Sequence, residues 1–419
     1  MSYTNKAISL DLAIIGAGPA GLAAATKARS LGLKDVVVFD RDEKAGGILS
    51  QCIHPGFGLL RYGEALTGPE YAWREIQAAV KEGAKIELDS MVTNIDRNGQ
   101  VTVASSRGVQ HYRSKSIILA MGCRERTRPA VRIPGTRPAG VFTAGKAQRL
   151  VNIEGRLPGR RVVIVGSGDI GMIMARRLTL EGCYVEAVVE INPFTSGLIR
   201  NEVQCLHDFN IPLLLGYEVT DIRGYNRVEE ITVAAREPNG SIIPGTERAI
   251  ACDTVLLSVG LIPENELSRQ VGIFIDPTTN GPKVDNFLET DYPGMFACGN
   301  VLHVNDLVDE VSFEGELAAE GAVAEMGHKL PEKINKVTLT HGNNIGQLVP
   351  QELQYAHESR VAIRVRQPTG SATLRIGEVF KKRLLFTRPG EMIIIKLSAE
   401  QIKELSKDKT TVEVTIACE

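Results

Sequence analysis

Three kinds of residue in this chain have the chemistry of a redox or nucleotide site: glycines at strand ends, acidic residues that follow them, and seven cysteines. The cysteines are scattered, and the closest two, Cys183 and Cys205, lie 205 − 183 = 22 residues apart. No C-x-x-C or C-x4-C pair exists, so we expect no redox-active disulfide, no local metal site and no iron–sulfur cluster in this chain. We expect most of the cysteines to be small buried hydrophobic residues in a reducing compartment.

The first glycine-rich turn lies in DLAIIGAGPAG, which runs from Asp11 to Gly21. An apolar stretch leads into Gly16 and Gly18, and small residues typical of a closely packed helix follow. The first glycine permits a tight turn, the second lets the backbone approach a pyrophosphate, and the third lets helix and strand pack closely. The next apolar stretch, VVVFD, ends on Asp40, 40 − 16 = 24 residues after Gly16, where a carboxylate can accept hydrogen bonds from ribose hydroxyls.

A second copy of this pattern occurs in RVVIVGSGDIG, with Gly166, Gly168 and Gly171. The stretch CYVEAVVE then ends on Glu190, again 190 − 166 = 24 residues after the first glycine. Two copies with equal spacing predict two dinucleotide sites. A carboxylate at this position binds the 2′-hydroxyl of NAD and repels the 2′-phosphate of NADP, so we expect NADH to be preferred; Arg200 leaves NADPH open as the less favoured cofactor.

Regular elements must hold these turns in place. Residues 8–40 have the pattern of a β-α-β unit. A connection rich in glycine and proline follows, and its composition predicts a long loop that passes close to a cofactor. Helical spacing resumes in GPEYAWREIQAAVKEG, where we expect Ala72, Ile76, Ala79 and Val80 to form one apolar face.

Further residues beside the first turn reveal a family resemblance. Asp40, Arg41 and the pair Gly46-Gly47 form a D-R-x4-GG arrangement, and TDYPGMFACGNV, which begins at Thr290, has the form of a closing FAD element. Together with the first turn they resemble the FAD-binding end of the two-dinucleotide-binding-domain flavoproteins. Asn300 departs from the family pattern, which has an aspartate contacting the ribityl chain of the flavin; an amide can still hydrogen-bond a hydroxyl.

The resemblance implies roles for specific residues. The implied FAD-binding residues are Gly16, Gly18, Gly21, Asp40, Arg41, Gly46, Gly47, Gly122, Gly299 and Asn300. The implied NAD-binding residues are Gly166, Gly168, Gly171, Glu190 and Gly260. The helix in SFEGELAAEGAVAEM is expected to point its amino terminus at the flavin, where its partial positive charge would stabilise the anionic reduced ring.

The predicted fold class is α/β, with two Rossmann-like dinucleotide-binding domains, the NAD domain inserted in the FAD domain, and a small β-rich C-terminal domain. We place the FAD domain at residues 1–143 and 254–335 and the NAD domain at 144–253. Residues 336–419 contain short strand-like stretches, VAIRVRQ, ATLRIG, KRLLFTR, EMIIIKL and TVEVTIA, with one helical stretch, SAEQIKELSK. This last domain is either a partner or dimer surface or a stabilising appendage.

Cys52 and His54 are the candidate catalytic residues, because they follow Gly46-Gly47 where the chain should pass the flavin. They could tune the flavin or relay a proton. The alternative is that both are ordinary residues of the loop. Hydride transfer from nicotinamide to flavin needs orientation and no general acid, so no catalytic triad is expected.

Three stretches, GGILSQCIHPGFGL, AMGCRERTRPAVRIPGTRPAGVFTAGKAQ and the GSGDIG turn, indicate a subgroup. They look like the flavoprotein alpha subunits of opine oxidase, heterotetrameric sarcosine oxidase and dye-linked proline dehydrogenase, and particularly the oxidoreductase encoded beside anaerobic-type glycerol-3-phosphate dehydrogenase. This resemblance implies a partner dehydrogenase subunit, in some complexes an iron–sulfur carrier, and an oligomeric assembly.

Three functions follow from these observations. The first is an electron-transfer subunit that exchanges hydride with NAD(H) and electrons with a partner dehydrogenase. The second is a self-contained NADH oxidase or quinone or dye reductase. The third is a nucleotide-binding scaffold or sensor without turnover.

Composition sets the remaining expectations. The chain has 419 residues, 43% of them hydrophobic, a formal charge of −2 and a pI near 6.4, so nucleic acid is not an expected partner. The stretch MSYTNKAISL lacks the basic and apolar regions of a signal peptide, and no apolar run approaches the roughly 20 residues of a membrane helix. We expect a cytoplasmic protein without a membrane span.

Overall fold

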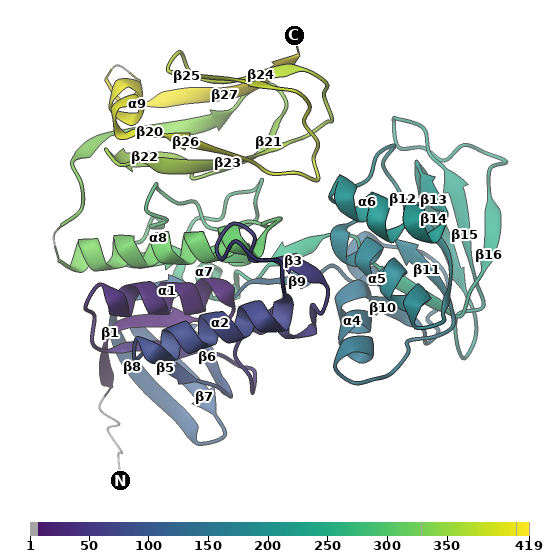
Figure 1. Ribbon diagram of the computed structural model, residues 1–419, viewed down its shortest axis with the longest axis horizontal. Coiled ribbons are helices and arrows are strands. Elements are labelled where there is room, and N and C mark those ends of the chain that lie inside the picture. Colours follow the sequence, from purple (N-terminus) through teal and green to yellow (C-terminus); the bar gives the residue numbers. More distant parts are fainter. Residues whose placement is uncertain (1–6, 328, 408, 419) are drawn as a thin grey trace. The chain divides into compact units, whose positions relative to one another are not determined.

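The computed structural model describes residues 7–327, 329–407 and 409–418. Contacts divide the chain into two compact units: Met1–Cys123 with Pro263–Glu419, and Arg124–Ile262 (Figure 1). The second unit is thus an insertion in the first, as predicted. The first six residues, on which the expectation about a signal peptide rests in part, lie outside the described residues.

The central sheet of the first unit has seven strands in the order β5-β2-β1-β8-β7-β6, with β19 also paired to β8. β1 (Ile8–Ile15) runs parallel to β2 (Val36–Phe39) and β8 (Gly108–Leu119). Parallel strands are covered on both faces, which is why β2 is an unbroken apolar run and why β1 and β8 end in the buried apolar stretches LAII and IIL. The other strands of this sheet are β5 (Lys85–Glu87), β6 (Ser90–Ile95), β7 (Gln100–Ser105) and β19 (Met295–Ala297).

Two helices, α1 (Pro19–Ser30) and α8 (Val308–Met326), pack side by side on this sheet (Figure 1). They approach closely because both are rich in alanine and glycine: a Cβ on Gly315 of α8 would lie 2.1 Å from the carbonyl oxygen of Ala20 in α1. The sequence predicted a helix that starts at Ser312. In the structure α8 starts at Val308, 312 − 308 = 4 residues earlier.

α2 (Gly68–Lys81) begins with a capping box. The Thr67 side chain accepts a hydrogen bond from the backbone NH of Glu70, and the Glu70 side chain accepts one from the backbone NH of Thr67. The predicted apolar face is wrong at Val80, which is 55% exposed. Tyr71 and Glu75 are buried instead, each with no exposed surface. A buried glutamate on a helix face cannot be recognised from hydrophobic spacing, because its place there depends on partners from another segment.

The inserted unit has a parallel sheet of order β10-β17-β11-β12-β13 and an antiparallel sheet of order β14-β15-β16. The strands of the parallel sheet are β10 (Val141–Thr143), β11 (Arg161–Val165), β12 (Tyr184–Glu190), β13 (Leu213–Leu215) and β17 (Thr254–Leu257). Those of the antiparallel sheet are β14 (Tyr217–Arg223), β15 (Glu230–Ala235) and β16 (Arg248–Ala251). Its helices include α4 (Ala144–Asn152), α5 (Asp169–Leu180) and α6 (Ile199–Cys205).

The predicted domain boundaries at 143/144 and 253/254 fall inside this unit, which runs from Arg124 to Ile262. The reason is the pairing of β10 with β17, in which Val141 is in register with Val255. β17 also pairs in parallel with β11, so both flanking strands belong to the inserted sheet. Strand pairing across more than 100 residues leaves no local signal in the sequence.

The C-terminal region forms two sheets, β22-β20-β27-β24-β25 and β21-β23-β26, around its own apolar core. The predicted helix and four of the predicted strands are present, and the fifth prediction, KRLLFTR, overlaps its strand only at residues 382–384. The elements are β23 (Ser359–Val365), β24 (Ala372–Ile376), β25 (Phe380–Leu384), β26 (Ile393–Leu397), β27 (Thr411–Cys418) and α9 (Ala399–Leu405). Three further strands are β20 (Lys333–His341), β21 (Ile345–Val349) and β22 (Glu352–Tyr355).

Short elements connect these layers. They are η1 (Gly47–Gln51), β3 (Pro55–Phe57), β4 (Leu66–Thr67), β9 (Cys123–Glu125), α3 (Arg128–Val131), η2 (His207–Phe209), β18 (Leu261–Pro263), α7 (Glu266–Val271) and η3 (Gly299–Val301). Among the described residues, no helix combines the length and the apolar character needed to cross a membrane.

A pair of acidic side chains near the end of α8 predicts a pH-dependent stability. Burial raises the pKa of Glu289 to about 7, and neighbouring Glu325 adds to the rise. The folded protein therefore binds a proton more tightly than the unfolded chain, so this contribution to stability is present at low pH and is lost as pH rises from about 4.5 to about 7. Asp285, whose pKa burial raises to about 6, acts in the same direction.

We therefore expect the melting temperature of Glu289→Gln to fall less than that of the wild type as pH rises through this window, because glutamine needs no proton. Thermal unfolding followed by circular dichroism between pH 4.5 and 7 measures this. Glu378→Gln, at an exposed position of the C-terminal region, is the control and should follow the wild type. Parallel pH curves for wild type and Glu289→Gln would contradict the prediction.

Candidate functional site

The first glycine turn has the geometry of a pyrophosphate site. Gly16 has φ +110°, and a Cβ there would lie 2.3 Å from the carbonyl oxygen of Ala120. A Cβ on Gly21 would lie 1.9 Å from the oxygen of Gly16, so helix α1 and strand β1 can meet only through glycine. Around Gly18, the N-cap of α1, a Cβ would meet nothing within 4 Å. The amino end of α1 is thus open to an anionic group.

The D-R-x4-GG residues assemble on the same turn. The backbone NH of Ala17 donates to Oδ2 of Asp40 at 2.6 Å, and the NH of Gly46 donates to the carbonyl of Ala17 at 2.8 Å. A Cβ on Gly47 would lie 3.2 Å from the Cα of Gly18. Residues 40, 46 and 47 therefore surround the open amino end of α1, and the carboxylate of Asp40 stands at the end of β2 where a ribose would lie.

Two other predicted FAD residues lie near one acidic side chain of this unit. Arg41 is mostly exposed, with its guanidinium 3.9 Å from the carboxylate of Glu264. Gly122 follows β8 with φ +72°, and its carbonyl accepts a hydrogen bond from the NH of Glu264 at 3.0 Å. The structure thus places both residues beside Glu264, close to Pro263, where the chain re-enters the first unit.

Gly299 and Asn300 form the start of a turn that touches α1. Gly299 has φ +73°, and a Cβ there would lie 2.9 Å from the Cβ of Ala20. The side chain of Asn300 is engaged within the protein: its Oδ1 accepts from the NH of Asn305 at 3.0 Å, and its Nδ2 lies 3.6 Å from Sγ of Cys123. Asn300 thus shapes this turn, whatever it offers to a cofactor.

The amino end of α8 carries negative charge as well as the helix dipole. Asp309 and Glu310 occupy its first turn. The buried carboxylate of Asp309 accepts hydrogen bonds from the backbone NH groups of Gly58, at 3.2 Å, and Arg61, at 2.9 Å. Two carboxylates thus accompany the helix dipole at this end, and that of Glu310 is paired with Arg360. The expectation that this helix end stabilises the reduced flavin stays a prediction.

A buried ionic network, absent from the sequence analysis, fixes the loop after η1. Glu75 of α2 accepts from Nε of Arg61 at 2.6 Å and from the hydroxyl of Tyr62 at 2.6 Å. Arg61 also pairs with Glu316 of α8 at 2.8 Å. Burial raises the pKa of Glu75, while Arg61 opposes that rise. The sequence signal for this network was the pair Arg61 and Tyr62 in the stretch GFGLLRYG, because polar side chains inside an apolar loop need hydrogen-bond partners.

The structure places Cys52 and His54 in the loop that follows η1. The Cys52 sulfur lies 3.4 Å from the carbonyl oxygen of Ile48, and its own carbonyl accepts from the NH of Gly68 at 2.9 Å. The ring of His54 stacks on Phe57 with the ring centres 4.9 Å apart. Burial raises the pKa of the Cys52 thiol to about 12, so at neutral pH it is a protonated thiol and not a thiolate.

We expect Cys52 to react with iodoacetamide at pH 7.5 more than about tenfold more slowly than the exposed Cys418, because the thiolate is the reacting species. Time-resolved labelling of the native protein, read by peptide mass spectrometry, measures both rates. Labelling in denaturant is the control, in which the two rates should converge. A native rate at Cys52 equal to that at Cys418 would contradict the assigned environment.

The second glycine turn repeats the backbone geometry of the first. Gly166 has φ +92°, and a Cβ there would lie 2.1 Å from the carbonyl oxygen of Ser258. A Cβ on Gly171 would lie 3.0 Å from the oxygen of Gly166. Gly260 follows β17 with φ +98°, and its carbonyl accepts from the NH of Arg126 at 3.0 Å. The predicted NAD residues of this unit thus meet at the carboxyl ends of β11, β12 and β17.

Glu190 is more enclosed than its counterpart Asp40. It is 2% exposed, and its Oε2 accepts from the NH of Ser167 at 2.9 Å, from the Ser167 hydroxyl at 2.5 Å and from the Ser196 hydroxyl at 3.0 Å. Its Oε1 accepts from the NH and the side-chain amide of Asn192 at 2.9 and 2.8 Å. A carboxylate has about four acceptor positions, so the protein's own groups fill them.

The loop before α6 covers the amino end of α5. A Cβ on Gly197 would lie 2.9 Å from the backbone nitrogen of Asp169, the first residue of α5. The carboxylate of Asp169 accepts from the NH of Leu198 at 2.9 Å and from the amide of Asn201 at 2.6 Å. The predicted NAD turn therefore has less open space than the FAD turn. Nowhere in the described ranges do three or more His, Cys, Asp or Glu side chains cluster as a metal ion would require.

Comparison with known families gives one match over most of the chain. The sequence profile described as pyridine nucleotide-disulphide oxidoreductase matches residues 10–323. This range contains both glycine turns and ends within α8.

Three curated relatives are named as subunits or chains of an enzyme. An opine oxidase subunit of Agrobacterium tumefaciens (strain Ach5) is 27% identical over 75% of this chain and 66% of its own length. The glutamate synthase [NADPH] small chain of Escherichia coli (strain K12) is 29% identical over 75% of this chain and 68% of its own. Hydrogen cyanide synthase subunit HcnB of Pseudomonas protegens is 27% identical over 64% and 60%. The chain thus spans about two thirds of the length of these relatives.

Solved structures share the fold. Thioredoxin reductase of T. acidophilum superimposes with a TM-score of 0.62 at 24% identity, covering 76% of this chain and 99% of the other. L-proline dehydrogenase of P. horikoshii superimposes with a TM-score of 0.52 at 19% identity, covering 76% and 56%. The two-domain dinucleotide-binding fold predicted from the sequence is confirmed.

Proposed function

Because the chain belongs to the pyridine nucleotide-disulphide oxidoreductase family, with FAD and NAD(P)H as its cofactors, we propose that it is an electron-transfer subunit. In this role it exchanges hydride with NAD(H) and passes electrons to or from a partner dehydrogenase. The observation that carries the proposal is the assembly of two complete glycine turns in one chain, each with an acidic residue at the following strand end. FAD supplies a hydride acceptor that can release its electrons one at a time.

The residues of the first turn hold FAD in this proposal. The open amino end of α1 at Gly18 receives the pyrophosphate, and Asp40 accepts hydrogen bonds from a ribose. The fit is supported because, among the described residues, a Cβ on Gly18 would meet no heavy atom within 4 Å beyond its own chain neighbours. The residues around Gly168 hold NAD(H), and the carboxylate of Glu190 disfavours the 2′-phosphate of NADP(H) through like charge.

The route of the electrons is the finer part of the proposal. A redox-active disulfide needs paired cysteines, and the sequence has no C-x-x-C or C-x4-C spacing. Without such a pair, electrons leave the flavin to a small acceptor or to a second protein. We propose a partner protein, consistent with relatives whose names describe them as subunits or chains of an enzyme. We place the chain with the flavoprotein subunits of glycerol-3-phosphate or amino-acid and amine dehydrogenases, and any iron–sulfur carrier in a partner.

Anaerobic titration of the purified flavoprotein with NADH and, separately, with NADPH tests this proposal. We expect NADH to bleach the flavin near stoichiometric amounts, NADPH to do so less readily, and the lone chain to consume oxygen slowly. Copurification of a stoichiometric dehydrogenase subunit from the source cells would support the partner. Rapid oxygen consumption would replace the proposal by a self-contained oxidase, and a flavin that neither nucleotide reduces would replace it by a scaffold.

A further inference from the structure

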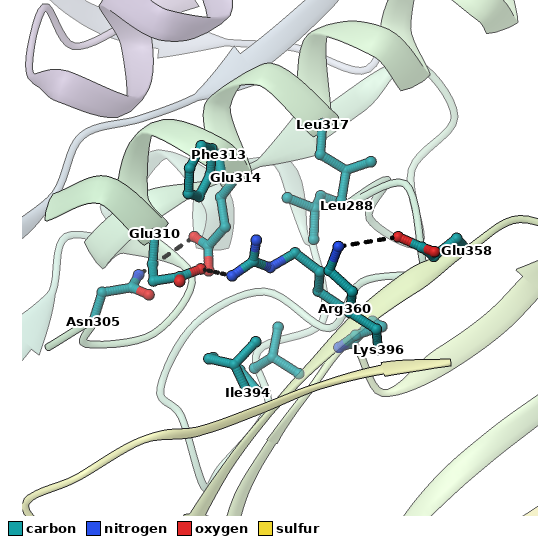
Figure 2. A pocket seen from close by; sticks show the side chains of 13 residues that line it. Leu288, Asn305, Glu310, Phe313, Glu314, Leu317, Glu358, Arg360, Ile394 and Lys396 are labelled. Carbon is teal, nitrogen blue, oxygen red and sulfur yellow. Dashed lines mark hydrogen bonds and ion pairs between the residues drawn. The ribbon is translucent and has the colours of Figure 1, made fainter. Parts of the chain in front are cut away.

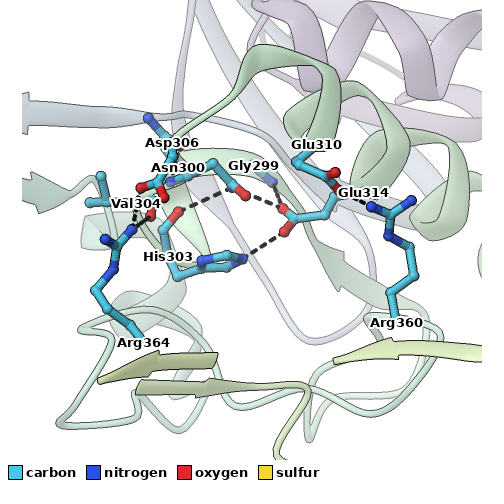
Figure 3. Close-up of polar contacts among 10 residues, drawn as sticks. Gly299, Asn300, His303, Val304, Asp306, Glu310, Glu314, Arg360 and Arg364 are labelled. Atoms are coloured by element: carbon cyan, nitrogen blue, oxygen red, sulfur yellow. Dashed lines mark hydrogen bonds and ion pairs between the residues drawn. The ribbon is translucent and has the colours of Figure 1, made fainter. Parts of the chain in front are cut away.

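Two arginines of one strand join the C-terminal region to the segment before α8 and to the first turn of α8. β23 carries Arg360 and Arg364 four residues apart, so both side chains leave the same face of the strand. Arg360 pairs with Glu310 in the first turn of α8, and Arg364 pairs with Asp306 just before α8 (Figure 3).

Arg364 makes the more extensive of these contacts. Besides Asp306, it donates to the carbonyl of Val304 at 3.2 Å and to that of Pro389 at 2.6 Å. The second carboxylate oxygen of Asp306 accepts from the NH of Met392 at 2.5 Å. The two charged side chains are only 16% and 13% exposed, so little solvent screens their attraction. Removal of one partner would leave the other charge buried without its counterpart.

Arg360 crosses a gap and does not lie in a packed layer. Figure 2 shows a pocket between α8 and the strands β23 and β26, with Arg360 reaching over it to Glu310. Its guanidinium carbon also lies 5.2 Å from the ring centre of Phe313, close enough for a cation–π contact. At this point the C-terminal region is joined to α8 by these directed ionic contacts and by apolar side chains, because Ala362 and Ile394 pack with the core that includes Leu317.

The segment that Arg364 contacts belongs to the turn formed by residues 299–306. From its other side Glu314 of α8 holds it, because one carboxylate oxygen accepts from the NH of Gly299 at 2.7 Å and the other lies 2.6 Å from Nε2 of His303 (Figure 3). His303 has no exposed surface. Gly299 in turn lies against Ala20 in the first turn of α1. The 299–306 turn is thus fixed between β23, α8 and the amino end of α1.

We infer that Arg364 is a positioning residue for FAD, acting through the 299–306 turn. The inference rests on the proposed seat of FAD at the amino end of α1, which this turn adjoins. The C-terminal region then has a role in the flavin site through this turn. The competing reading is that the two ion pairs only attach the C-terminal region to α8. Attachment alone predicts a change in stability and no change in the flavin.

Arg364→Met and Asp306→Asn are the test variants, made separately and together in the full holoprotein. The dissociation constant of FAD, from the recovery of flavin fluorescence on dilution, and the midpoint potential of the bound flavin are measured well below the melting temperature. We expect each single variant to raise the dissociation constant about tenfold and to shift the potential, because a charged hydrogen-bonded contact is lost. The double variant should be no worse than the worse single variant, since both remove the same contact.

Two matched controls separate positioning from stability. Arg375→Met removes an exposed arginine from β24 in the other sheet and should change neither quantity. Leu374→Ala opens the core of the same region, where Leu374 is fully buried, and should lower the melting temperature without changing the flavin potential. An Arg364→Met protein with wild-type FAD affinity and potential would overturn the inference.

A conservative variant covers the case in which Arg364→Met gives no folded holoprotein. Arg364→Lys keeps a positive charge near Asp306 but cannot reach three acceptors at once. A weakened FAD affinity in this variant supports the inference, and an unchanged affinity and potential overturn it. Failure of the proposed function is a distinct result, because it appears in the wild type as a flavin that NADH does not reduce.

Discussion

Gly18→Arg is expected to yield a folded protein that has lost FAD. The backbone of Gly18 has φ −75° and ψ −177°, which any residue adopts, and a Cβ there meets nothing within 4 Å. The substitution therefore strains no part of the fold. Its side chain would occupy the open amino end of α1, where the pyrophosphate must approach the backbone. We expect the dissociation constant of FAD to rise at least about 1,000-fold, which corresponds to about 4 kcal/mol.

The measurement is the visible spectrum of the purified variant before and after incubation with FAD and gel filtration. Gly370→Arg is the matched control, because a Cβ on Gly370 also meets nothing within 4 Å and the position lies on the surface of the C-terminal region. The control should keep a stoichiometric flavin. Unfolding curves of the apoproteins should coincide for wild type and Gly18→Arg. If the purified Gly18→Arg protein still binds one FAD per chain, the first turn is not part of the flavin site.

Gly168→Arg is expected to keep FAD and to lose reduction by NADH. Gly168 is the N-cap of α5 with φ −65° and ψ 158°, so an arginine is sterically compatible with its backbone. A Cβ there lies 3.0 Å from Oγ of Ser258, and a change of the Ser258 rotamer relieves this contact at the cost of the hydrogen bond that Oγ accepts from the NH of Gly171. The long side chain would fill the approach to the second turn. We expect the rate of flavin reduction by NADH to fall about 100-fold or more, as misplaced hydride donors react slowly.

Anaerobic stopped-flow absorbance at saturating NADH in the wild type measures this rate. Chemical reduction by dithionite is the internal control, because it does not use the nicotinamide site and should proceed in the variant as in the wild type. Paired with Gly18→Arg, this experiment assigns one cofactor to each turn. A Gly168→Arg protein that NADH reduces at the normal rate would mean that the second turn is a structural element of the inserted unit.

The enclosed state of Glu190 bears on this second experiment. Its carboxylate is saturated by Ser167, Asn192 and Ser196, and the adjacent loop lies over the amino end of α5. A ribose that binds Glu190 must therefore displace a hydroxyl that the carboxylate already holds, most simply that of Ser196 on the loop. The preference for NADH remains a prediction, and its electrostatic basis is unaffected because the negative charge stays in place.

The sequence by itself determined the parts of this protein that depend on local backbone geometry. Glycines at positions such as 16 and 166 have positive φ and sit where a Cβ would collide with a carbonyl, so only glycine satisfies both requirements. A strand, a turn and a small-residue helix follow one another within about 20 residues, and their pattern is readable without tertiary information. The two turns, the strand-end acids and most strands of the C-terminal region from β23 onward were predictable for this reason.

The tertiary structure alone decided which distant side chains meet. Arg364 and Asp306 are 58 residues apart, and their contact depends on how β23 packs beside the start of α8. Burial of Glu75, exposure of Val80 and membership of β10 in the inserted sheet are likewise set by neighbours remote in the chain. Hydrophobic spacing reports a residue's face on its own element and carries no record of the partner that covers that face, so these features emerged only when the elements were assembled.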